Sequence, residues 1–280
     1  MRLVFKLFIL GVVLVPTFRV SAARDSVFVN LGASDSRNNI YFDLGAGGPP
    51  IFLGDIRWLN SVARLQSNVN VYSNDDTTAL SEYIYNSVFI KPLDATSRVV
   101  GGIMLSSRSE GASPNLHSNT LFPSGFISYS RHLPDNPKWK YSIVLVVPDR
   151  SSRKFAIPGV GFEYEGGPGD WTLQIRFPES QLLWVTENSD EWGISVSYFT
   201  KDFLLRNRKA LNGEDLYVES ERLLFALVNK IQLGHGLKIN SKLAYAQINV
   251  LNLHNKNFKK LSLLTRNEGF YFSTGLSWGF

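Results

Sequence analysis

The chain contains no cysteine among its 280 residues. A disulfide framework, a thiolate metal site and a cysteine nucleophile are therefore excluded. A sustained helical periodicity is also missing, which argues against a helical fold. No segment after the first 22 residues has the roughly 18 consecutive apolar residues that a membrane-spanning helix needs. The absences leave a fold that is built from strands and stabilised without cross-links.

The first 22 residues have the organisation of a secretory signal peptide. Arg2 and Lys6 give it a basic start, an apolar run follows, and small residues precede a cleavage site after Ala22 or Ala23. No cysteine follows that site, so a lipid-anchored lipoprotein is excluded. Removing Arg2, Lys6 and Arg19 lowers the formal net charge from +5 to +2, because 5 − 3 = 2. This small charge gives no indication of nucleic-acid binding.

The last stretch of the chain, residues 269–280, alternates between two kinds of side chain. Large apolar residues occupy most alternate positions, and mainly small or polar residues lie between them. This period of two predicts a strand with one apolar and one polar face. The stretch resembles the C-terminal assembly signal of Gram-negative outer-membrane β-barrels, which the barrel-assembly machinery reads. On that resemblance, the assembly-signal residues are Phe270, Phe272, Leu276, Trp278 and Phe280.

The same alternation recurs in the segments 171–177, 192–198 and 237–245. In a membrane barrel the apolar side chains of such strands face lipid, and the small or charged ones face a lumen. The charged residues then either line a narrow pore or pair with one another and fill the interior. The predicted lumen residues are Glu163, Glu165, Gln174, Arg176, Lys238, Asn240 and Lys242.

The connections between these segments alternate in length. Outer-membrane barrels have short periplasmic turns and longer outer loops, and tight turns are rich in Gly, Pro, Asn and Asp. The order places Phe280 at the periplasmic rim, and only the short connection at 178–180 departs from the rule. The expected periplasmic turns are 93–96, 132–137, 166–169, 187–190 and 234–236, and the expected outer loops are 73–81, 108–119, 149–156, 201–214 and 251–267.

These patterns predict an all-β fold, a transmembrane antiparallel up-and-down β-barrel of about 12 strands, within a range of roughly 10 to 14. We expect a signal peptide at 1–22 and the barrel at 60–280. Residues 23–59 form either an extra hairpin or a periplasmic or plugging segment. The expected location is the cell outer membrane. A soluble exported β-sandwich is the alternative fold, because it would also show alternation.

A second resemblance rests on the segment Ile157–Tyr164, followed by Trp171 and Phe177-Pro178. It is similar to a motif of an uncharacterised family of bacterial outer-membrane β-barrels, in which a Pro-Gly-containing strand precedes a Trp-bearing strand and a Pro turn. The similarity extends loosely from about residue 60 to Phe280. It implies a porin-like barrel and carries no activity.

The sequence favours a narrow passive channel or a structural barrel, with no cofactor, no metal and no enzymatic activity. The alternative is an outer-leaflet lipid-modifying hydrolase that uses His117 or His254, since both lie in expected outer loops. Neither a Gly-x-Ser-x-Gly nor a His-Glu-x-x-His motif is present. The other histidines, His132 and His235, lie in expected periplasmic turns.

Basic residues gather in three of the expected outer loops. The outer leaflet carries anionic lipopolysaccharide, which attracts cations at the level of its headgroups. We therefore expect contacts with outer-membrane lipid and lipopolysaccharide; the sequence predicts no particular oligomeric state. The candidate lipopolysaccharide contacts are Arg150, Arg153, Lys154, Arg206, Arg208, Lys209, Lys256, Lys259 and Lys260.

Overall fold

The computed structural model describes residues 26–34, 40–70, 77–111, 117–147, 156–209, 213–255, 257, 259–266 and 268–279. The expected signal peptide lies outside these ranges. None of the described residues form a helix that is long and apolar enough to cross a membrane.

The described chain forms one sheet of 16 strands in which sequence neighbours pair antiparallel. The strands are β1 (Ser26–Ser34), β2 (Ile40–Gly47), β3 (Ile51–Leu53), β4 (Ile56–Asn70), β5 (Thr77–Pro92), β6 (Ser97–Glu110), β7 (Leu121–Leu133), β8 (Asn136–Val147), β9 (Ile157–Glu165), β10 (Asp170–Ile175), β11 (Glu179–Val185), β12 (Glu191–Lys209), β13 (Asp215–Gly234), β14 (Leu237–Asn255), β15 (Lys260–Arg266) and β16 (Gly269–Gly279).

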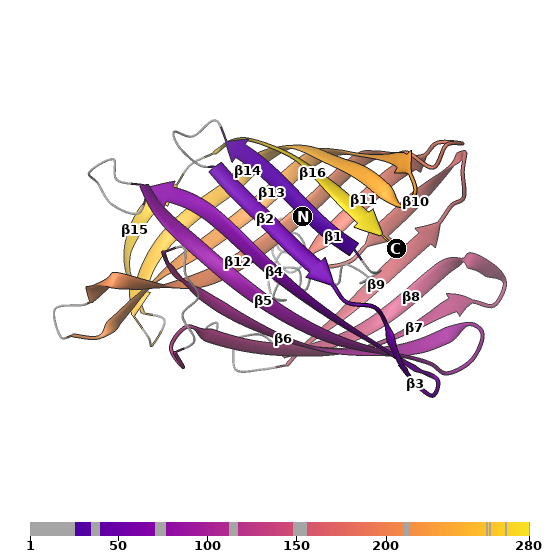
Figure 1. Ribbon diagram of the computed structural model, residues 1–280, viewed down its shortest axis with the longest axis horizontal. Coiled ribbons are helices and arrows are strands. Elements are labelled where there is room, and N and C mark those ends of the chain that lie inside the picture. The colour runs from indigo at the N-terminus through magenta and orange to yellow at the C-terminus, as the bar shows by residue number, and fades with distance from the viewer. Residues whose placement is uncertain are drawn as a thin grey trace, which may run out of the picture.

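The sheet closes on itself into a barrel (Figure 1). β1 pairs with β2 on one side and with β16 on the other, so the two ends of the described chain lie side by side. β2 and β3 pair with successive parts of β4, and β15 and β16 pair with successive parts of β14. Each of these two pairs of strands therefore occupies a single strand position in the barrel wall. Because 16 − 2 = 14, the barrel has 14 strand positions. The predicted barrel is confirmed, at the upper end of the expected strand number, and the sandwich alternative is wrong.

The N-terminal residues that the sequence left open contribute two of these strands. β1 and β2 form a hairpin within the wall, and β2 pairs with residues 61–67 of β4. The break at Gly48–Pro50 separates β2 from β3. Proline supplies no backbone donor, so the ladder is interrupted there. This hairpin accounts for the difference between about 12 strands and 14.

Exposure alternates along the strands as the lipid and lumen faces require. On β16, Phe272 is 52% exposed on the outer face, whereas its neighbour Tyr271 is 5% exposed on the inner face. An apolar surface that encircles a protein is compatible with lipid rather than water. Large side chains exposed on the outer face include Val62, Ile103, Ile127, Ile143, Val160, Phe162, Ile175, Ile194, Leu227, Leu243, Phe270 and Leu276.

Tryptophan marks one rim of this apolar surface. All six tryptophans of the chain lie within three residues of the strand end that carries the short turns, at the right in Figure 1. Several contact other aromatic rings across strands: Trp58 stacks on Phe89 at 5.6 Å, and Trp171 meets Trp184 edge-on at 5.2 Å. Such a girdle sits where headgroups meet the hydrocarbon. The six are Trp58, Trp139, Trp171, Trp184, Trp192 and Trp278.

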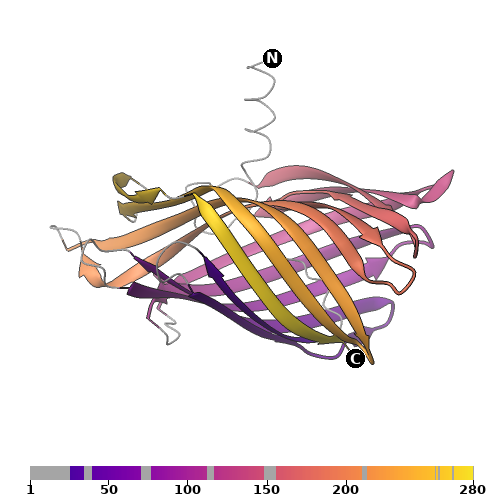
Figure 2. The ribbon, with the colours of Figure 1, turned by 90° about the horizontal axis from the view of Figure 1, so that it is seen from above.

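The strands differ greatly in length. β12, β13 and β14 have 19, 20 and 19 residues, whereas a tilted strand needs only about 9–11 to cross a bilayer. Their outer ends therefore extend past the membrane, with the β12–β13 hairpin at the left in Figures 1 and 2. There β12 crosses to the opposite wall and pairs in parallel with β6, Leu204 with Ser109. The outer end of the barrel is consequently narrower than a regular cylinder of 14 strands.

Closure can be tested by cross-linking the seam between β1 and β16. Val29 and Leu276 are direct partners, so their Cα atoms lie within the roughly 4.4–6.8 Å that a disulfide spans. Because the native chain has no cysteine, V29C/L276C has one possible disulfide within a chain. We expect it to form on mild oxidation and to change mobility on a denaturing gel. The mismatched pair V29C/G269C is the control; cross-linking of both pairs, or of neither, contradicts the closed register.

Candidate functional site

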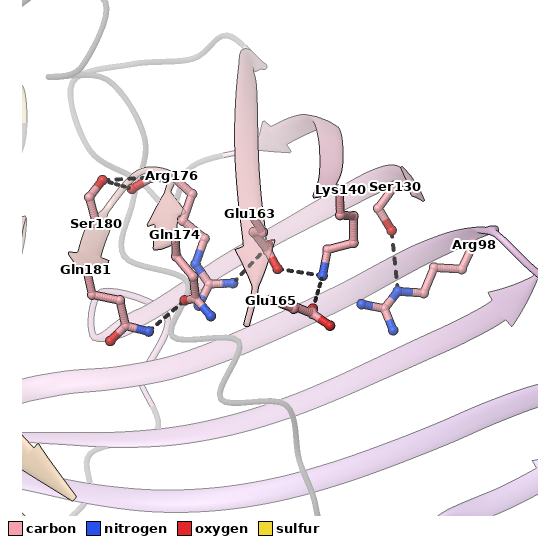
Figure 3. Close-up of polar contacts among 9 residues, drawn as sticks. All are labelled: Arg98, Ser130, Lys140, Glu163, Glu165, Gln174, Arg176, Ser180 and Gln181. Atoms are coloured by element: carbon pink, nitrogen blue, oxygen red, sulfur yellow. Dashed lines mark hydrogen bonds and ion pairs between the residues drawn. The ribbon is translucent and has the colours of Figure 1, made fainter. Parts of the chain in front are cut away.

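The inner wall near the short turns carries a ladder of charges (Figure 3). Lys140 on β8 contacts Glu163 at 2.5 Å and Glu165 at 3.0 Å, both on the neighbouring strand β9. Arg176, just after β10, lies 3.7 Å from Glu163 on its other side. Gly161 permits this packing, because a Cβ at that position would meet both Ser142 and the stem of Arg176. The Pro-Gly strand noted in the sequence thus leaves space for inward side chains.

Other predicted lumen residues also contact neighbours on the inner wall. The Gln181 amide donates to Gln174 at 2.7 Å, and the Asn240 amide donates to Ser277 at 3.0 Å. Lys242 on β14 reaches Glu179 on β11 at 3.2 Å. That ion pair spans β12 and β13, whose inner faces carry small buried residues such as Ser195 and Ala226. Most of the predicted lumen residues therefore pair across strands.

Positive charge nevertheless exceeds negative charge among the described residues of the inner wall. Ion pairs join six inward-facing cations to carboxylates: Arg108, Lys140, Arg176, Lys201, Lys230 and Lys242. Four further cations on inner-facing positions have no carboxylate within ion-pair distance among the described residues. Three lie in the first two residues of their strands at the turn end, and the fourth lies deep in β13. These four are Arg57, Arg98, Lys238 and Arg222.

A buried ion triad holds β12 against the opposite wall. Arg108 Nε on β6 donates to Glu82 on β5 at 2.7 Å, and Lys201 on β12 bonds the other carboxylate oxygen. Arg108 and Glu82 are each 2% exposed, and the Arg108 guanidinium lies 5.0 Å from the ring of Phe122. Buried charges are tolerated only when they are paired and hydrogen-bonded. The triad therefore specifies where β12 crosses.

An apolar cluster fills the space beyond this triad. It combines side chains from β5, β12, β13 and β14, which meet because β12 bends across the barrel. The backbone nitrogen of Arg206 adds a bond to the carboxylate of Glu110 at 2.9 Å. Together the cluster and the triad close part of the outer end; the cluster consists of Leu80, Phe203, Leu205, Leu216, Val218 and Leu251.

His254 lies on the opposite face of these long strands. Its Nε2 is 2.8 Å from Asp202 Oδ1 and its Nδ1 is 2.8 Å from the carbonyl oxygen of Asn255. Both partners are hydrogen-bond acceptors, so this geometry favours an imidazole that carries a proton on each ring nitrogen. Tyr217 stacks on the ring at 5.5 Å. His254 is thus a buried ion-pair partner, and neither nitrogen is positioned to take a proton from a nucleophile.

The other three histidines lie near the two ends of the barrel. The His117 side chain is exposed, and its carbonyl oxygen accepts from Thr120. His132 and His235 lie at the turn end, as predicted. Within the described residues, no group of three His, Asp or Glu side chains is arranged to hold a metal ion.

The described turns at the same end are held by local bonds. The Asp94 carboxylate accepts from the Ser97 hydroxyl at 2.6 Å and from the Thr96 amide at 2.7 Å. The Ser97 hydroxyl is the main cause of an Asp94 pKa well below its usual range, with the Thr96 amide next. A lowered folded-state pKa stabilises the turn above the unfolded pKa, and that stabilisation is lost as the pH falls.

The remaining predicted residues lie partly outside the described ranges. Phe280 does so, as do Arg150, Arg153, Lys154 and Lys256, while only the backbone of Arg208 and Lys209 is described. Phe270, Phe272, Leu276 and Trp278 occupy the lipid face of β16. Arg206 and Lys259 are exposed, and Lys260 lies 3.5 Å from Glu219. Lipopolysaccharide contact stays a prediction.

Comparison with known proteins gives only distant likenesses to solved structures. No family model matches the chain, and no curated protein matches its sequence. The KdgM porin is 8% identical with a TM-score of 0.43, over 91% of this chain and 99% of that one. Outer membrane phospholipase A from Escherichia coli is 9% identical with a TM-score of 0.41, over 91% and 92%. These distant likenesses carry no conclusion about function, and the barrel fold rests on the strand pairing described above.

Protonation of His254 can be measured directly. In a variant carrying H117Q, H132Q and H235Q, one histidine remains, and ¹⁵N NMR reports both of its ring nitrogens. We expect both to be protonated at pH 7, because each faces an acceptor. D202N serves as the matched variant and should favour the neutral ring, since it removes the carboxylate. A neutral imidazole in the wild-type side chain contradicts this arrangement and restores a candidate general base.

Proposed function

We propose that the protein is a narrow passive channel of the Gram-negative outer membrane that favours small anions over cations. The observation that carries the proposal is an inner wall that contains more cations than carboxylates. The Arg176 side chain faces inward yet is 44% exposed, so water has access to the inner wall. An apolar outer face and a wet, charged inner face are the features of a membrane channel.

The excess of positive charge supports the preference for anions. Arg57, Arg98 and Lys238 lie at the turn end of the inner wall, where a solute from the periplasm would enter. Charges that line a low-dielectric passage raise the local concentration of counter-ions. Deeper in the lumen, ion pairs such as Lys230–Glu191 neutralise much of the field. The preference is therefore expected to be modest.

The outer end supports a narrow passage. β12 crosses to β6, and the apolar cluster beyond Glu82 fills the space between them. Small barrels pack side chains into their interior, so the free cross-section depends on such features. A solute would pass beside this closure, under the shorter strands β9, β10 and β11, which have 9, 6 and 7 residues.

The membrane partners belong to the same proposal. The alternating β16 face supports recognition by the barrel-assembly machinery, and the exposed Lys259 supports contact with lipid phosphate in the outer leaflet. The expected signal peptide is consistent with export by the usual route.

Planar-bilayer recording of the purified mature chain tests the proposal. In a potassium chloride gradient we expect small discrete steps and a reversal potential on the anion-selective side. Silent bilayers at high protein density would leave a structural barrel as the function, and cation selectivity would contradict the charge argument.

The width of the passage is expected to depend on Glu82. E82Q leaves Arg108 and Lys201 without their shared carboxylate, which costs roughly 3–5 kcal/mol for a buried pair. The outer end of β12 should separate from β6, and single-channel conductance should rise. E191Q is the control, because it breaks the half-buried Lys230 pair at the turn end.

A disulfide gives this prediction a second arm. S109C/L204C joins the residues that pair between β6 and β12. Introduced into E82Q, the oxidised disulfide should restore the small single-channel conductance of the wild type. Reducing it should return the conductance to the higher value of E82Q. Equal conductance of wild type, E82Q and the cross-linked variant would show that the crossing does not limit the passage.

A further inference from the structure

Arg222 occupies an unusual position among the inward-facing cations. It lies well inside β13, whereas Arg57, Arg98 and Lys238 lie at strand starts near the turns. Its guanidinium carbon is 5.9 Å from the ring centre of Phe199 and 5.7 Å from that of Tyr271. Cation–π contact orients a guanidinium without neutralising its charge. The structure thus holds a positive group in the middle of the lumen by aromatic rings.

The hydrogen-bonding capacity of Arg222 is unused among the described residues. Its Nε is buried without a partner, and no carboxylate lies within ion-pair distance of its side chain. An arginine in a half-buried site normally bonds an acceptor, because an unmet charged donor costs free energy. Water or a solute must therefore supply the acceptor.

A second polar group without a partner lies beside it. Ser197 on β12 is 7% exposed, and its hydroxyl has no hydrogen-bond partner. Ser197 pairs with Leu224 and Phe199 pairs with Arg222, so Ser197 and Arg222 are diagonal neighbours on the inner face. Diagonal neighbours on one face lie about 7–8 Å apart, which a long side chain covers. The two unpartnered groups therefore lie close together on the same part of the inner face.

The surroundings define where such a ligand would stop. Towards the outside, Leu251 occupies the next inner-face position and Val218 the one after it, and both belong to the apolar cluster. Towards the turns, the small residues Ala226, Ala244 and Ala246 are buried in one cluster with Tyr271. Arg222 therefore stands at the inner limit of the closed outer end, where an anion arriving from the turn end meets it.

We propose that Arg222 and Ser197 form a binding position for an oxyanion, a carboxylate or phosphate group of a small solute, inside the lumen. This inference rests on the proposed channel function and names the residue that selects the solute. The guanidinium fork matches the two oxygens of a carboxylate or phosphate. The serine hydroxyl donates a further bond, and the aromatic rings keep the guanidinium in place.

The test uses the full mature protein in planar bilayers, with inorganic phosphate and acetate as probes of chloride current. Phosphate should block the wild-type current, and R222Q should raise its half-blocking concentration at least about tenfold, as expected for a lost charged hydrogen bond. R222K keeps the charge but loses the fork, so it should fall between the two. S197A should raise the half-blocking phosphate concentration by about a few-fold, as expected for the loss of one neutral hydrogen bond.

A matched control and a second measurement separate the possible failures. R131Q removes a cation from an exposed position on the outer face and should leave block unchanged. Equilibrium dialysis of radiolabelled phosphate against the detergent-solubilised protein reports binding without current. Wild-type binding that R222Q abolishes, in silent bilayers, would retain the site and reject the channel. Equal binding and equal block in wild type and R222Q overturn the site, whatever the conductance.

Discussion

Backbone hydrogen bonding in lipid is the constraint on which this structure depends. Strands in a bilayer have no water to satisfy their N–H and C=O groups, so every edge must be paired. The pairing of β1 with β16 removes the last edges and fixes the register of the whole wall. Once the sheet is closed, each residue faces either lipid or lumen. The apolar outer face, the tryptophan rim and the charged interior all follow from that division.

The interior must then accommodate the polar side chains that the outer face excludes. Pairs such as Lys140–Glu163 and Lys242–Glu179 join neighbouring or distant strands across the inner wall. Buried ion pairs add little net stability to the fold, but removing one partner leaves an unpaired buried charge, which costs free energy. They therefore specify which strands lie together. The Glu82 triad does so for the crossing of β12, and Arg222, stacked on aromatic rings in place of a carboxylate, keeps a charge for a solute.

Local sequence patterns were sufficient for the fold class. Alternation in 171–177 and 192–198 and the spacing of short turns predicted a closed barrel, because both are properties of single strands and their connections. The strand number was less certain, since Gly48–Pro50 interrupts the pattern between β2 and β4. The prediction of which residues face the lumen rests on the same alternation.

The closure of the outer end could not be predicted in the same way. Glu82, Arg108 and Lys201 are far apart in sequence and meet only because β12 is longer than the wall beside it. The segment 201–214 was expected to be an outer loop, yet its first part continues β12 to Lys209. The one available signal was the run of apolar residues at 203–205, which is unusual for a solvated loop. Likewise, the contact of His254 with Asp202 joins residues 52 positions apart, which local patterns do not bring together.

The access of water to successive side chains along one strand tests the central claim most directly. Single cysteines introduced in turn at 238–243 of β14 can be treated, in the membrane, with a water-soluble thiol reagent, since the native chain has no competing thiol. The barrel predicts reaction at the even positions that face the lumen, such as Lys238, and protection at the odd positions that face lipid, such as Leu243. Uniform reaction along the strand, or protection at every position, would contradict a water-filled barrel.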